Sequence, residues 1–204
     1  MKIAIALSLG MALELSAQRP TSATYITDED VKAVLATPGI DHTIRVVDIG
    51  NENFAIGIIH RGATGAAAPA RGGGRANAAT SPCGDQMSTP PADALPGAIT
   101  HDSQTEGYYI VSGGGTLVTG GRIVNGSRSA PDAAVTKELN GPSCSGLIAG
   151  PGAVKRVVKA GDIIIIPAGV PHGWTEIADH VDYLSFRPSD HVLDAGYVHP
   201  AIRK

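Results

Sequence analysis

Two short segments of the chain carry residue types that bind transition metals. His101 and Glu106 are separated by four residues, and His172 follows the turn sequence Pro167-Ala168-Gly169. Imidazole nitrogen and carboxylate oxygen together suit borderline cations such as iron, manganese, nickel and zinc. Turns of this kind deliver the next side chain to the end of a sheet, so both segments can reach one point. We therefore predict one divalent transition metal held by His101, Glu106 and His172.

Neighbouring residues are candidates for chemistry or for the pocket around the metal. Tyr108 shares strand parity with Glu106, so its phenol could donate a proton to a substrate, although an ordinary core tyrosine fits the same position. Trp174, two residues after His172, is expected to form a wall of the substrate pocket. Glu176 continues the same face as a candidate catalytic base, with a solvated strand end as the alternative.

A further histidine could complete the site. His60 and Ile58 share one face of a predicted strand, since side chains alternate along a strand. His60 could therefore supply another ligand or a catalytic group from an adjacent strand, with Ile58 lining the substrate pocket. The alternative is a strand-end histidine bonded to a loop.

Short β-strands are predicted to position these residues, because runs of branched apolar residues are bounded by Gly, Pro and Asn. The runs span 42–49, 53–60, 98–100, 107–112, 116–119, 154–158, 163–166 and 181–186. Gly113-Gly114-Gly115 is expected to form a tight turn, and the four isoleucines of 163–166 a buried strand. One helix is predicted, from a Thr27 cap through Leu35. The pattern favours an all-β barrel or jelly roll.

Together the two metal-binding segments resemble the motifs of the cupin superfamily. The first motif is matched by His101, Glu106 and Gly113. The second motif is matched by Gly161, Pro167, Gly169 and His172. The resemblance covers residues 100–176 and implies a single cupin-type jelly-roll β-barrel with a mononuclear metal centre.

One position departs from the cupin pattern at the metal. Cupins commonly have another metal histidine where this chain has Ile99, and often an asparagine where it has Glu176. The resemblance therefore implies three protein ligands instead of four, with Ile99 facing the substrate. Two histidines and a carboxylate with open positions are also the ligands of non-haem iron oxygenases.

The resemblance implies a metal-dependent enzyme that acts on a small molecule. The reaction could be that of an oxidoreductase of the dioxygenase type, or of a lyase or isomerase, because the fold does not choose among them. The alternative is a non-catalytic, metal-containing module that binds a small molecule or sugar. A homodimer is a further expectation from the resemblance.

Length and composition limit the wider organisation of the chain. Its 204 residues suit one compact domain, and a net charge of -3 argues against nucleic acid as a partner. Residues 62–97, which include Arg71 to Arg75, and residues 120–152 are rich in Gly and small polar residues. We predict that both are long loops and that the first is a flexible insertion.

The N-terminus predicts export. Lys2 and an apolar run over 3–13 resemble a secretory signal, so residues 1–17 are expected to be a signal peptide whose removal leaves no membrane anchor. Residues 18–41 would then be a helical N-terminal segment and 42–204 the barrel. A periplasmic or secreted location would permit a disulfide between Cys83 and Cys144, with two free thiols as the alternative.

Overall fold

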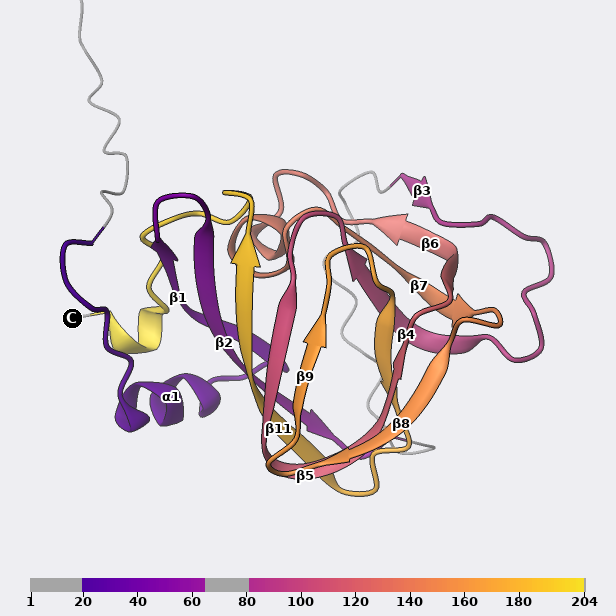
Figure 1. Ribbon diagram of the computed structural model, residues 1–204, viewed down its shortest axis with the longest axis horizontal. Helices are drawn as coiled ribbons and strands as arrows, with labels where there is room; N and C mark the ends of the chain where they lie inside the picture. Colours follow the sequence, from indigo (N-terminus) through magenta and orange to yellow (C-terminus); the bar gives the residue numbers. More distant parts are fainter. Residues whose placement is uncertain (1–19, 65–80, 204) are drawn as a thin grey trace, which may run out of the picture.

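Helix α1 (Asp28–Leu35) forms where the sequence predicts it. In the computed structural model, which describes residues 20–64 and 81–203, the Thr27 hydroxyl accepts a hydrogen bond from the Asp30 amide at 3.2 Å. The Asp30 carboxylate accepts one from the Thr27 amide at 3.1 Å. The helix packs against the outside of the first two strands (Figure 1). The prediction of a short N-terminal helix is confirmed.

This cap should make a measurable contribution to stability. Changing Thr27 to alanine removes the acceptor for an otherwise unpaired amide, so we expect the free energy of unfolding to fall by about 1 kcal/mol. Urea denaturation followed by circular dichroism measures the change. Ser22→Ala, in the exposed segment before the helix, is the control. A loss for Thr27→Ala no larger than that of the control would contradict this reading of the cap.

The described part of the chain contains eleven antiparallel strands, which make up about half of it. They are β1 (Asp41–Asp48), β2 (Asn53–Gly62), β3 (Pro82–Cys83), β4 (Leu95–His101), β5 (Glu106–Thr119), β6 (Arg122–Arg128), β7 (Ser143–Ala149), β8 (Val154–Lys159), β9 (Ile163–Ile166), β10 (His172–Thr175) and β11 (His180–Ser189). A π-helical turn (Val135–Asn140) precedes β7, and a 3-10 turn (Pro200–Ile202) lies near the C-terminus. The all-β prediction is confirmed.

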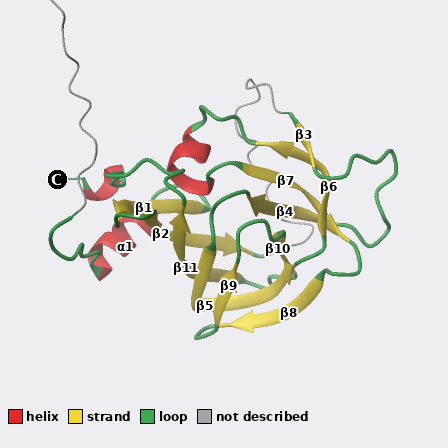
Figure 2. Ribbon diagram, turned by 45° about the horizontal axis from the view of Figure 1, so that its top comes forward, coloured by secondary structure: helices red, strands yellow, loops and turns green. Residues whose placement is uncertain are grey.

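The strands form two sheets that share β5. The first sheet has the order β1-β2-β11-β5-β9, and the second has the order β8-β5-β10-β4-β7-β6-β3. Because β5 passes from one sheet into the other, the sheets close around a common interior (Figures 1 and 2). The largest core cluster fills this interior. Its members include Ile59, Tyr108, Ile110, Trp174 and Tyr183. The result is the predicted jelly-roll barrel.

The glycine run in β5 is not the predicted tight turn. Gly113 to Gly115 lie inside one continuous strand, at the point where its partners change from β9 and β11 to β8 and β10. Gly113 has φ 65°, and a Cβ there would meet the carbonyl oxygen of His180 at 2.0 Å. The glycines therefore allow close backbone approach and a change of direction within the strand.

Two other expectations about the strands are corrected. Residues 120–152 are not one long loop, because they contain β6, the π-helical turn and β7. Their small residues serve close packing instead: a Cβ on Gly146 would lie 2.8 Å from the Gly126 Cα. The isoleucine strand is not fully buried, because Ile163 and Ile165 are each 73% exposed while Ile166 is buried.

The predicted insertion over 62–97 is only partly described. Gly62 ends β2, β3 lies within the segment, and residues 95–97 begin β4. Arg71 to Arg75 and the predicted signal peptide, residues 1–17, lie outside the described residues. Within the described ranges, no helix is both long and apolar enough to cross a bilayer.

A disulfide joins β3 to β7 within the second sheet. It joins Cys83 to Cys144 across a Cα–Cα distance of 6.0 Å, and both residues are buried in a cluster with Val118 and Ile148. Of the two alternatives, a disulfide or two free thiols, the structure contains the disulfide. Disulfides of this kind are found mainly in proteins of oxidising compartments, which agrees with the predicted export.

Candidate metal centre

Strand ends bring the three predicted ligands together. His101 is the last residue of β4, Glu106 is the first of β5, and His172 is the first of β10. The turn before His172 is fixed to β4, because the amide of Gly169 donates to the carbonyl oxygen of His101 at 2.7 Å. Gly169 has φ 80°, a conformation that glycine adopts at little cost. This contact holds the two motif segments side by side.

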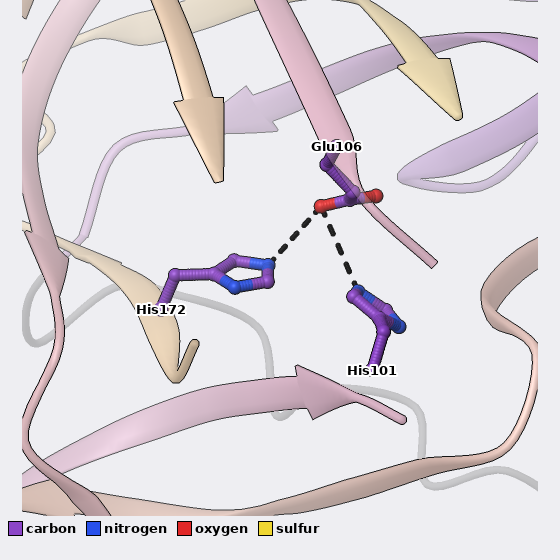
Figure 3. Close-up of side chains that lie close together, drawn as sticks. All are labelled: His101, Glu106 and His172. Carbon is purple, nitrogen blue, oxygen red and sulfur yellow. Dashed lines mark ion pairs between the residues drawn. The ribbon is translucent and has the colours of Figure 1, made fainter. Parts of the chain in front are cut away.

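The three side chains surround one point in the barrel (Figure 3). Glu106 Oε2 lies 3.1 Å from His172 Nε2 and 3.6 Å from His101 Nε2. One ligand atom from each residue can be chosen so that all three lie within 4.8 Å of one another. All three residues are buried, with 2–3% of their surface exposed. The structure thus assembles a buried group that could bind a metal ion.

The donor set fits a metal. His101 Nδ1 lies 2.8 Å from the carbonyl oxygen of Asn140, and His172 Nδ1 lies 3.0 Å from that of Val170. Carbonyl oxygens only accept, so Nδ1 of each neutral ring carries the proton and Nε2 has a free lone pair. Both lone pairs then face the Glu106 carboxylate, which also only accepts. A cation between them removes this conflict, and metal-binding histidines are typically held by such a second hydrogen bond.

Glu106 is held from its other side by an arginine. Arg187 Nε donates to Glu106 Oε1 at 2.9 Å, and Arg187 Nη2 contacts both carboxylate oxygens of Asp41 at 2.8 and 2.9 Å. Burial alone would raise the pKa of Glu106, but the charge of the Arg187 guanidinium holds that pKa well below its usual range. The carboxylate is therefore ionised, as a metal ligand must be.

Tyr108 points into the barrel, as strand parity predicts, and its hydroxyl donates to Glu106 Oε2. Its ring lies 6.3 Å from that of His172 and 4.4 Å from that of Tyr183. Burial, followed by the charge of Glu106, raises the pKa of Tyr108 well above the ordinary value. The phenol is therefore protonated and lies beside the oxygen that faces the histidines.

The expected pocket residues Trp174 and Ile99 also lie on the inner side. Ile99 pairs directly with His172 in the β4–β10 register. Trp174 is buried in the main core cluster, and its ring is 5.5 Å from that of Tyr183. Its indole N–H has no hydrogen-bond partner among the residues that the structure describes. Ile99 is therefore the cross-strand neighbour of His172, and Trp174 lies two residues after His172 on the same strand.

The structure does not bring His60 and Ile58 to the metal group. Their neighbour Ile59 is fully buried inside the barrel, so the alternation of β2 turns His60 and Ile58 to the outer face. His60 Nδ1 lies 2.6 Å from an oxygen of Asp182, and Ile58 packs in a cluster with Val34 of α1. The expectation of inward-facing residues is corrected, because α1 makes the outer face of this strand apolar as well.

Glu176 also lies away from the ligands. It follows β10 with φ 49°, and its Oε2 accepts a hydrogen bond from the Thr116 hydroxyl at 3.0 Å. At about 3.3 Å per residue, four residues separate it from His172 by roughly 13 Å along the chain. Its exposed position agrees with the alternative of a solvated strand end.

Two residues that support Glu106 were not predicted from the sequence: Arg187, which contacts it, and Asp41, which contacts Arg187. Arg187 lies two positions beyond Ser185 on the inward parity of β11, and Asp41 begins β1. An arginine on the inner face of a strand is the signal that could have identified the first, since a buried charge needs a partner. Asp41 had no comparable signal, because 146 residues separate it from Arg187.

Comparison with solved structures finds remote similarities. An uncharacterised conserved protein with a double-stranded β-helix domain from Klebsiella pneumoniae is 15% identical, with 86% of this chain and 93% of that chain covered and a TM-score of 0.39. Oxalate oxidase in complex with glycolate is 14% identical, with 77% and 55% covered and a TM-score of 0.34. A protein from Neisseria meningitidis is 9% identical, with 80% and 100% covered and a TM-score of 0.34.

Neither a family model nor a curated protein matches the chain. The fold and the metal group are therefore described from the strand pairing and the side-chain distances of this chain alone. His101, Glu106 and His172 occupy the ends of the strands that the motif spacing assigns to them. The chain therefore has a jelly-roll β-barrel with a buried His-Glu-His group that could bind a metal ion.

Proposed function

We propose that this protein is a cupin enzyme that holds one divalent transition metal through His101, Glu106 and His172 and acts on a small molecule. The observation that supports it is the convergence of two imidazole nitrogens and one carboxylate oxygen on one buried point. Each imidazole is held by a backbone carbonyl, which orients its Nε2 lone pair toward that point. Three protein ligands leave open positions for a substrate.

The reaction that we propose is a dioxygenase-like oxidation, and a lyase or isomerase reaction would use the same residues. A bound iron, manganese, nickel or zinc ion would supply Lewis acidity, and iron or manganese could also supply redox chemistry. Tyr108 would act as the proton donor, because its protonated hydroxyl lies at the metal-facing oxygen of Glu106. Ile99 and Trp174 would bound the substrate on the side of His172.

A non-catalytic metal-containing binding module is the second candidate. The low exposure of the three ligands favours it, because turnover needs a substrate to reach the open coordination positions, whereas a module can bind its small molecule or sugar without reaching the metal. In that case the Tyr108 hydroxyl would serve only to hold Glu106. Removal of that hydroxyl should therefore lower turnover if the protein is an enzyme, whereas a binding module has no turnover to lose.

Oxygen uptake by the metal-loaded protein with a panel of phenols and diketones separates the two candidates. For the enzyme, we expect turnover that Tyr108→Phe lowers by about 100-fold, the lower end of the usual range for a general acid. Metal content should be unchanged in that variant, because the phenylalanine retains the ring and leaves all three ligands. Ligand binding without oxygen uptake or product formation would favour the binding module.

A further inference from the structure

The guanidinium of Arg187 forms hydrogen bonds to other protein groups through all three of its nitrogens. Its Nε donates to both Glu106 Oε1 and the Ser185 hydroxyl at 2.9 Å, its Nη2 contacts both oxygens of Asp41, and its Nη1 donates to the carbonyl of Leu139 at 3.4 Å. The residue is 1% exposed. Each of its three nitrogens has a protein partner and the residue is buried, so the guanidinium is not placed to bind a substrate from solution. Its role must lie in what it does to its partners.

The two oxygens of Glu106 have separate environments as a result. Oε1 accepts from Arg187, whereas Oε2 faces both histidines and accepts from Tyr108. For a carboxylate to bind a metal through both oxygens, Oε1 would have to rotate toward the histidines and leave the guanidinium. That movement would break the buried contact between Arg187 Nε and Oε1, and would leave Asp41 as the remaining carboxylate partner of Arg187.

We infer that Arg187 is a positioning residue that makes Glu106 bind the metal through Oε2 alone. The inference rests on the proposed metal site and adds the geometry of that site. A single oxygen from Glu106, with one nitrogen from each histidine, leaves one more coordination position open than a chelating carboxylate would. Arg187 thereby sets how many positions a substrate can use.

The guanidinium is held in place from three other sides. Asp41 on β1 fixes its far end, the π-helical turn contributes the Leu139 carbonyl, and Gly57 on β2 makes room for it. A Cβ on Gly57 would lie 3.3 Å from Arg187 Nη1. Lysine could keep the charge, but it cannot contact Glu106 and both oxygens of Asp41 at once, because it lacks the planar fork of donors.

Infrared spectroscopy of protein labelled with 13C-glutamate tests the inference. The metal-loaded minus metal-free difference spectrum reports the carboxylate stretches of ligating glutamate, and the separation between the symmetric and asymmetric stretches distinguishes one bound oxygen from two. Glu106→Gln identifies the band. Metal affinity is measured on the same samples, and metal content is established before any spectrum is recorded.

The parent should show the wide separation of a carboxylate bound through one oxygen. In Arg187→Met and Arg187→Lys, we expect the narrow separation of a chelating carboxylate and a loss of metal affinity of about 10- to 100-fold. Ser185→Ala is the matched control, since it removes another partner of Arg187 and leaves the Glu106 contact in place. It should keep the parent spectrum and an affinity within about twofold.

The outcomes distinguish an error about Arg187 from an error about the metal site. A parent that binds metal with a chelating Glu106, or an arginine variant that keeps the parent band, would overturn the role of Arg187 and leave the metal site standing. A parent that binds no metal would overturn the proposed function itself, and the inference with it. If Arg187→Met does not fold, the parent band and Arg187→Lys decide the question.

Discussion

Replacing His172 with alanine is expected to remove bound metal, from near one equivalent per chain to a small fraction of that. The imidazole is one of the three proposed ligands among the described residues, and its Nε2 lies 3.1 Å from the Glu106 oxygen that would share the ion. Loss of a residue that merely supports a ligand costs about 10- to 100-fold in affinity, so loss of the ligand should exceed about 100-fold. Elemental analysis of purified protein and metal titration measure the change.

His60→Ala is the matched control for this prediction. It also removes a histidine, but from the outer face of β2, where the side chain contacts Asp182. We expect the control to retain the parent metal content and affinity. Equal metal loss in both variants would mean that His172 acts through general stability, and full retention in His172→Ala would place the metal elsewhere.

Loss of the disulfide should produce the largest change in stability. Cys83 and Cys144 are 61 residues apart, and a cross-link over a loop of this length restricts the unfolded chain by about 4 kcal/mol in the loop-entropy model. We therefore expect the double variant Cys83→Ser/Cys144→Ser to lose about that much free energy of unfolding, measured by urea denaturation at equal pH.

The parent protein treated with a reducing agent provides the control, because its sequence is unchanged. It should lose a similar amount, and each single variant should resemble the double variant. Metal content of the folded double variant should stay near that of the parent, because the disulfide belongs to a separate cluster from the main core. A loss below about 1 kcal/mol would show that β3 is held by its packing alone.

The metal ligands could be predicted because the information is local. His101 and Glu106 are the residues on either side of one short connection, and the turn before His172 is encoded by adjacent Pro and Gly residues. Only one long-range step was needed, the pairing of β10 with β4 and β5. Strand parity likewise placed Tyr108 inward, because its neighbour Glu106 fixed the face.

Parity alone did not determine which face of β2 is inward. Ile58 and His60 alternate with Gly57 and Ile59, and the sequence favours the face that carries Ile58 because it contains the larger side chains. In the structure α1 covers part of that outer face, so both faces are apolar. The position of a helix on a sheet is a tertiary contact that the strand sequence does not encode.

Glycine-rich composition also misled the sequence interpretation. Small residues usually indicate loops, but Gly113 and Gly146 lie in strands where another backbone approaches too closely for a Cβ. The contact between Arg187 and Asp41 could not be predicted either, because it joins distant parts of the chain. Asp41 reaches Arg187 from the other end of the chain, and only the folded sheet brings β1 and β11 to the same side of the metal group.

A crystal of the metal-loaded protein measured at the absorption edge of the bound element tests the central claim most directly. The account predicts a single anomalous peak within bonding distance of Nε2 of His101, Nε2 of His172 and Oε2 of Glu106. A peak bound by other residues, or no peak at this point in protein that carries one equivalent of metal, would contradict it.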